Sequence, residues 1–212
     1  MKKSLWSSPW LSRIAFVLCL LPLAWLAWRW WHNDLGINRI EFVARYTGRW
    51  TLRILLASLA ITPLRRIPGL SPLIRFRRML GLFAFFYGTL HAFHYFGIDV
   101  QWNFQTIVED LTYRRFFIAG AISLALMVPL AATSFDKAIR WIGGKRWQLL
   151  HRLVYISAIA AIVHFWWQGK VGTQTPQLYA AILTVLLAIR VVLWIAKGAQ
   201  NRQRQAPAAT PR

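Results

Sequence analysis

The chain has 212 residues, of which 57% are hydrophobic and only 15% are charged. About a quarter of the residues are charged in an ordinary soluble domain, so this composition excludes that class and indicates an integral membrane protein. Lysine and arginine outnumber the acids by 26 to 6, but they gather at the ends of apolar runs instead of forming a separate basic domain. That pattern is typical of membrane topology and contact with anionic lipid, and it argues against nucleic-acid binding.

Six apolar segments follow one another along the chain, and each is a candidate transmembrane helix. They are residues 10–31, 50–64, 79–96, 116–135, 149–167 and 178–196. A helix needs about 20 residues to cross a bilayer; the second segment is the weakest, because Arg53 interrupts it and Pro63 ends it. We predict an all-α integral membrane protein with a six-helix transmembrane bundle in residues 1–199. A polar tail, 200–212, is expected to be disordered and cytoplasmic.

The charged residues between the segments predict the orientation of the bundle. The connections after the second and fourth segments are strongly basic, with Arg65, Arg66, Arg75, Arg77, Arg78, Lys137, Arg140, Lys145 and Arg146. Five of the six acids lie in the opposite connections. Because basic connections stay in the cytoplasm, both termini are predicted to be cytoplasmic.

Three histidines stand out within the apolar segments. His91 is twelve residues into the third, and His151 and His164 are thirteen residues apart in the fifth. At 1.5 Å per residue, His91 and His164 each lie about 20 Å from the cytoplasmic end of their helix. An ionisable side chain inside a membrane is costly, and imidazole is a common axial ligand of haem iron. We therefore predict that His91 and His164 bind one b-type haem; the ordinary alternative is a hydrogen bond to a neighbouring helix.

The cytoplasmic half of the predicted bundle holds His151 without a second histidine at its depth. The third segment offers Arg77 and Arg78 there instead. His151 is therefore open to three roles: it could bind a second haem, contribute to binding the first haem, or bind another redox group. Guanidinium groups suit oxyanions, so Arg77, Arg78 and Arg152 are candidates for a haem propionate or a flavin phosphate, with membrane topology as the alternative.

The other histidines and the sequence motifs carry less weight. His32 is expected at the membrane boundary, and His94, one turn beyond His91, as a spare ligand or a propionate partner. The chain has no GxGxxG, P-loop, HExxH or GxSxG motif, so no nicotinamide site is visible in the sequence. Electrons are then expected from a quinone or from another protein.

Several short stretches together resemble the MsrQ (YedZ) family, a group of ferric-reductase-like transmembrane proteins. They are Tyr46-Thr47-Gly48-Arg49, Ile61-Thr62-Pro63-Leu64, Arg77-Arg78-Met79-Leu80-Gly81-Leu82, Leu90-His91, Thr133-Ser134, the run from Gly144 to Tyr155, and His164. The resemblance implies an inner-membrane electron carrier with haem b and, in some members, FMN. It implies electrons from respiratory quinone or a cytosolic flavin reductase, passed to a periplasmic molybdopterin-containing subunit that repairs oxidised methionines.

By position, His91, His151 and His164 match the haem histidines of that family. Larger ferric-reductase relatives have two histidines on each ligand helix, whereas the third segment here has one at the corresponding depth, which leaves one or two haems open. We expect the catalytic subunit to dock on the outer connections 97–115 and 169–176, since this chain shows no catalytic motif of its own. The alternatives are a stand-alone transmembrane ferric reductase and a transporter with a histidine proton relay.

Overall fold

The computed structural model describes residues 9–168 and 175–205, and every regular element in this part of the chain is helical. The α-helices are α1 (Pro9–Trp31), α2 (Arg39–Leu64), α3 (Phe76–His94), α4 (Phe104–Tyr113), α5 (Arg115–Ala132), α6 (Asp136–Ile142), α7 (Gly144–Leu150), α8 (Leu153–Gln168) and α9 (Thr175–Gln205). A 3-10 turn (Ser71–Arg75) precedes α3 and a π-helical turn (Tyr95–Asp99) follows it. The all-α prediction is confirmed for the described residues.

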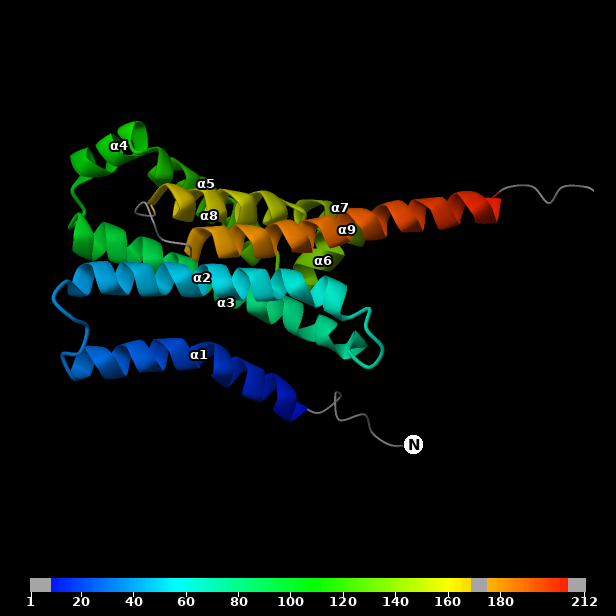
Figure 1. Ribbon diagram of the computed structural model, residues 1–212, viewed down its shortest axis with the longest axis horizontal. Helices are drawn as coiled ribbons and strands as arrows, with labels where there is room; N and C mark the ends of the chain where they lie inside the picture. Colours follow the sequence, from blue (N-terminus) through cyan, green and yellow to red (C-terminus); the bar gives the residue numbers. More distant parts are fainter. Residues whose placement is uncertain (1–8, 169–174, 206–212) are drawn as a thin grey trace, which may run out of the picture.

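Two helix pairs form the centre of the molecule. The pair α2 and α3 and the pair α5 and α8 have the most extensive contacts, α3 also packs on α5, and α9 covers α8 and α2. Figure 1 shows these long helices running side by side, while α1 lies along one side of the bundle. The core where the pairs meet contains Leu55, Leu59, Tyr87 and Ala158, all nearly inaccessible to solvent.

Four helical segments of the described chain are long and apolar enough to cross a membrane. They are Trp10–Trp31, Arg115–Ala132, Gly144–Gln168 and Thr175–Ala196. The other two predicted spans correspond to α2 and α3, which carry more polar side chains: Arg45, Arg49 and Arg53 lie within α2. The count of six spans and the placement of the termini therefore stay predictions.

Two tyrosines bind α1 to the bundle. The hydroxyl of Tyr87 accepts from the Leu23 amide at 3.2 Å and donates to the Cys19 carbonyl at 2.8 Å. In an uninterrupted helix the Leu23 amide would donate directly to the Cys19 carbonyl. The hydroxyl of Tyr46 donates to the carbonyl of Pro22 at 2.9 Å. Since Pro22 lacks an amide hydrogen, this turn of α1 is open to side-chain partners, and α2 and α3 supply them.

Helix ends differ most from the sequence prediction. α2 begins at Arg39 rather than at residue 50, because Asn38 caps it by accepting from the Glu41 amide at 3.0 Å. The connection 97–115 contains α4, and residues 169–174 of the second predicted docking loop lie outside the described residues. α9 continues to Gln205, and residues 206–212 also lie outside the described part, so the tail 200–212 stays a prediction.

Candidate functional site

The two histidines matched in depth by the sequence face each other across the helix pairs. His91 comes from α3 and His164 from α8, and their ring centroids are 6.0 Å apart with the ring planes at 77°. Both side chains are partly buried, and the helices α3 and α8 that carry them both pack against α2 and α5. The structure therefore brings together the two residues that were predicted as one ligand pair.

Each of these imidazoles is oriented by a backbone carbonyl of the neighbouring helix. Nδ1 of His91 lies 3.0 Å from the Ala44 oxygen on α2, and Nδ1 of His164 lies 2.7 Å from the Phe116 oxygen on α5. A carbonyl can only accept, so Nδ1 carries the hydrogen and donates in both rings. Nε2 then keeps its lone pair in both rings, which is the arrangement found in metal-ligating histidines.

Glycines make room for both rings. A Cβ atom on Gly120 of α5 would stand 2.6 Å from Nδ1 of His164, and one on Gly48 of α2 would stand 3.2 Å from Cε1 of His91. Each glycine lies four residues after the carbonyl that accepts from the same ring, on the same helix face. The two helix pairs thus repeat one local arrangement of carbonyl, glycine and opposing histidine.

This geometry fits a metal cofactor held between two imidazoles. Bonds of about 2 Å from a metal ion to a ring nitrogen on either side place the two ring centroids about 6 Å apart, and the observed separation is 6.0 Å. Haem iron accepts two such axial ligands. No cluster of three or more histidine, cysteine or acidic side chains suited to a metal ion occurs among the described residues, so the pair fits a haem better than a bare ion.

His151 lies elsewhere, in the turn between α7 and α8. Its Nε2 is 3.1 Å from the hydroxyl of Thr133, and its ring stacks on Trp147 with centroids 3.8 Å apart. Trp147 in turn donates from Nε1 to the Thr133 carbonyl at 2.9 Å. The helix is interrupted at His151, between the end of α7 and the start of α8. His151 and His164 therefore do not lie on one continuous helix.

The three candidate arginines have different surroundings. Arg78 forms a salt bridge of 2.6 Å with Asp136 at the surface, and this bond holds the pKa of the Asp136 carboxyl below its ordinary value. Arg152 is exposed at the start of α8. Arg77 is partly buried and close enough to His151 for an electrostatic interaction. Of the three, Arg77 is the one that has an electrostatic effect on His151.

The remaining histidines are not part of the pair. His94 is buried at the end of α3, and its Nδ1 has no hydrogen-bond partner. His32 is exposed and stacks on Trp28 with centroids 4.2 Å apart. Sequence reasoning missed the roles of Gly48, Gly120 and Thr133. Small residues inside apolar helices mark close helix contacts, and that signal would have pointed to Gly120.

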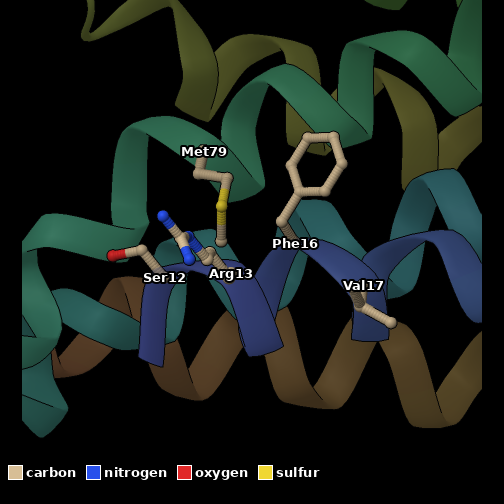
Figure 2. Close-up of a pocket in the computed structure, with 5 residues that line it drawn as sticks. All are labelled: Ser12, Arg13, Phe16, Val17 and Met79. Carbon is tan, nitrogen blue, oxygen red and sulfur yellow. The ribbon is translucent and has the colours of Figure 1, made fainter. Parts of the chain in front are cut away.

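A hollow of about 490 Å³ lies away from the histidines, between α1 and α3. Figure 2 shows Met79 of α3 reaching toward Arg13 of α1, with the ring of Phe16 beside it and Ser12 and Val17 on either side. None of these five side chains is a predicted ligand, and Arg13 is the only charged one. The hollow therefore does not coincide with the candidate cofactor site.

Comparisons with known proteins identify the relatives of this chain. The family described as "Ferric reductase like transmembrane component" matches residues 47–162, a range that includes His91 and His151 and ends two residues before His164. A protein of Ralstonia nicotianae is 45% identical over 89% of this chain and 88% of its own length. Proteins of Polaromonas naphthalenivorans (47% identical, 84% and 82% covered) and Rhodospirillum rubrum (46%, 86% and 88%) are similar to the same extent. All three are named protein-methionine-sulfoxide reductase heme-binding subunit MsrQ.

Proposed function

We propose that this chain, which belongs to the MsrQ family of ferric-reductase-like transmembrane proteins, binds b-type haem and carries electrons through the bacterial inner membrane to a methionine sulfoxide reductase. The observation that supports this most strongly is the facing pair His91 and His164, each with Nδ1 held by a carbonyl and Nε2 left for a metal. Its relatives are named heme-binding subunits of such a reductase.

The outer haem is assigned to His91 and His164 as axial ligands. Haem supplies a one-electron couple when it is bound. The chain's own residues hold the two imidazoles in the ligating tautomer through the Ala44 and Phe116 carbonyls. Gly48 and Gly120 leave the rings free to approach each other.

The cytoplasmic half is assigned to a second redox group near His151, either a second haem or FMN. Arg77, Arg78 and Arg152 are the proposed partners of its propionate or phosphate. The closeness of Arg77 to His151 supports the first of them. Because Arg78 forms a salt bridge with Asp136, it would have to interact with Asp136 and the cofactor oxyanion at the same time.

The proposed topology has six spans, α1, α2, α3, α5, α8 and α9, with both termini in the cytoplasm. Residues 1–199 form the haem-binding domain and 200–212 a cytoplasmic tail. Respiratory quinone or a cytosolic flavin reductase donates the electrons. Reporter fusions test the orientation: the connection 65–78 should report inside and the connection 102–115 outside, and the reverse result would contradict it.

The proposed acceptor is a periplasmic molybdopterin-containing catalytic subunit, docked on the connections 97–115 and 169–176. In this proposal the partner subunit, and not this chain, reduces methionine sulfoxide. The match to the ferric reductase family favours one second candidate, a stand-alone transmembrane ferric reductase.

Two measurements on purified protein test these assignments. A pyridine haemochrome assay with flavin analysis should find b-type haem, and its absence would contradict the proposal and leave the transporter alternative. Reduced protein should then deliver electrons to the catalytic subunit faster than to ferric chelate. The opposite preference would favour the stand-alone ferric reductase.

A further inference from the structure

Arg190 places a partly buried positive charge in the bundle, and no described acidic side chain forms a salt bridge with it. It lies on α9, and its guanidinium donates to the Tyr155 hydroxyl of α8 and to the Leu59 carbonyl of α2. The charge also lies over the Tyr155 ring, 4.9 Å from the centroid. Both acceptors are neutral, and the third guanidinium nitrogen, Nε, is buried with no hydrogen-bond partner.

A second arginine lies beside it. The backbone of Arg77 on α3 accepts from Ser58 of α2 at 3.1 Å, one residue before Leu59. Arg77 is close enough to interact electrostatically with both Arg190 and His151. Among the described residues, the four salt bridges involve neither Arg77 nor Arg190. Two cations and an imidazole, from α9, α3 and the α7–α8 turn, therefore interact in one region, and none of the three forms a salt bridge among the described residues.

Physical chemistry disfavours this arrangement in the bare chain. A buried charge without a counter-ion is strongly destabilising, and inside a membrane it is retained when it has a partner or a function. The neutral hydroxyl and carbonyl satisfy two donors of the guanidinium but cancel none of its charge. A planar guanidinium with a free donor is suited to a carboxylate or phosphate oxygen.

We propose that Arg190, together with Arg77 and Tyr155, forms an oxyanion site for the redox group served by His151. This inference rests on the proposed function, because it takes for granted a second cofactor in the cytoplasmic half. The ligand is an oxyanion of that cofactor, either a haem propionate or a flavin phosphate. The site combines Arg77 of α3 with a cation from α9, and α8 provides the hydroxyl of Tyr155.

The test compares Arg190→Gln with Arg140→Gln, since Arg140 is exposed on α6. Haem and flavin per protein are measured after purification from matched amounts of membrane-inserted protein. Arg190→Gln should lose at least half of the second cofactor, as haem if the oxyanion is a propionate or as flavin if it is a phosphate, and Arg140→Gln should lose neither. Full retention of both cofactors in Arg190→Gln would overturn the site.

Thermal unfolding separates loss of the ligand from loss of the fold. In cofactor-depleted protein, Arg190→Gln should melt no lower than the parent, because it removes an uncompensated charge. In cofactor-loaded protein it should melt lower. An equal decrease in both states would assign Arg190 a structural role and overturn the proposal.

Two further variants grade the effect. Arg190→Lys keeps the charge but not the planar fork, and should retain more of the second cofactor than Arg190→Gln. Tyr155→Phe removes one orienting hydroxyl and should have a smaller effect than either. A parent protein without any haem would contradict the proposed function, whereas a parent with haem and an unaffected Arg190→Gln variant would contradict this site alone.

Discussion

The two halves of the bundle present their histidines in opposite ways. In the half that contains His91 and His164, two imidazoles face each other at 6.0 Å, and each is fixed through Nδ1. In the half that contains His151, a single imidazole has its Nε2 3.1 Å from the Thr133 hydroxyl, and Arg77 interacts with it electrostatically.

This difference shows which part of a cofactor site the chain supplies by itself. The first half provides two imidazoles whose Nδ1 atoms are held by carbonyls, so the bare polypeptide already has the tautomer that the proposed ligands need. The second half provides one ligand and uncompensated positive charge, so it depends on an incoming anion. Substitutions should therefore act on the first half through metal bonds and packing, and on the second through charge.

The largest effect is expected from removal of either facing imidazole. His91→Ala and His164→Ala should each lower the outer haem content at least tenfold, because each removes one of two axial bonds. Haem per protein is measured by pyridine haemochrome on matched membrane-inserted protein. His32→Ala is the control, since His32 stacks on Trp28 away from the pair and should retain haem.

A smaller but graded effect is expected at the glycines. Gly120→Ala should shift the haem absorption bands or lower haem content more than Gly48→Ala, because the added Cβ would stand 2.6 Å rather than 3.2 Å from its ring. Overpacking of this kind costs about 1–3 kcal/mol. Gly81→Ala is the matched control on α3, where the nearest atom is 3.9 Å away. Equal behaviour of all three variants would contradict the close fit.

The half with His151 should respond less sharply. His151→Ala should change the haem content or the midpoint potential of the second redox group while the absorption of the outer haem persists. Thr133→Val removes the hydroxyl partner of Nε2 and should produce a weaker shift in the same direction. A potentiometric titration measures both, and simultaneous loss of all haem in His151→Ala would show that the two halves are not separate.

The smallest effect concerns the surface pair Arg78 and Asp136. The hydrogen bond from Arg78 lowers the pKa of Asp136, so the pair contributes stability above the unfolded-state pKa and loses it as the pH falls through the folded-state pKa. Exposed pairs contribute little. The difference in melting temperature between the parent and Asp136→Asn should be small at neutral pH and shrink in acid. A difference that widens in acid would contradict this sign.

The sequence predicted what depends on counting residues along a helix. The equal depth of His91 and His164 follows from 1.5 Å per residue and two helices entering from the same side, and the structure places the rings together. The all-α architecture follows from the apolar runs. Both predictions use regular geometry that is independent of the neighbouring helices.

Features that depend on neighbours were not predictable in the same way. The start of α2 at Arg39 depends on one cap by Asn38, and the interruption at His151 depends on its contacts with Thr133 and Trp147. The roles of Gly48 and Gly120 exist only once the opposing histidines are in place. The contacts of Arg190 with Tyr155 and Leu59 likewise depend on the neighbouring helices α8 and α2.

The most direct test of the central claim, that His91 and His164 are axial ligands of one haem, is imidazole rescue of His91→Gly. The variant should have depleted or altered haem, and added imidazole should restore a six-coordinate low-spin spectrum by entering the space left by the side chain. His94→Gly, one turn away on the same face of α3, should show the parent spectrum without imidazole. A parent spectrum in His91→Gly without imidazole, or no response to it, would contradict the assignment.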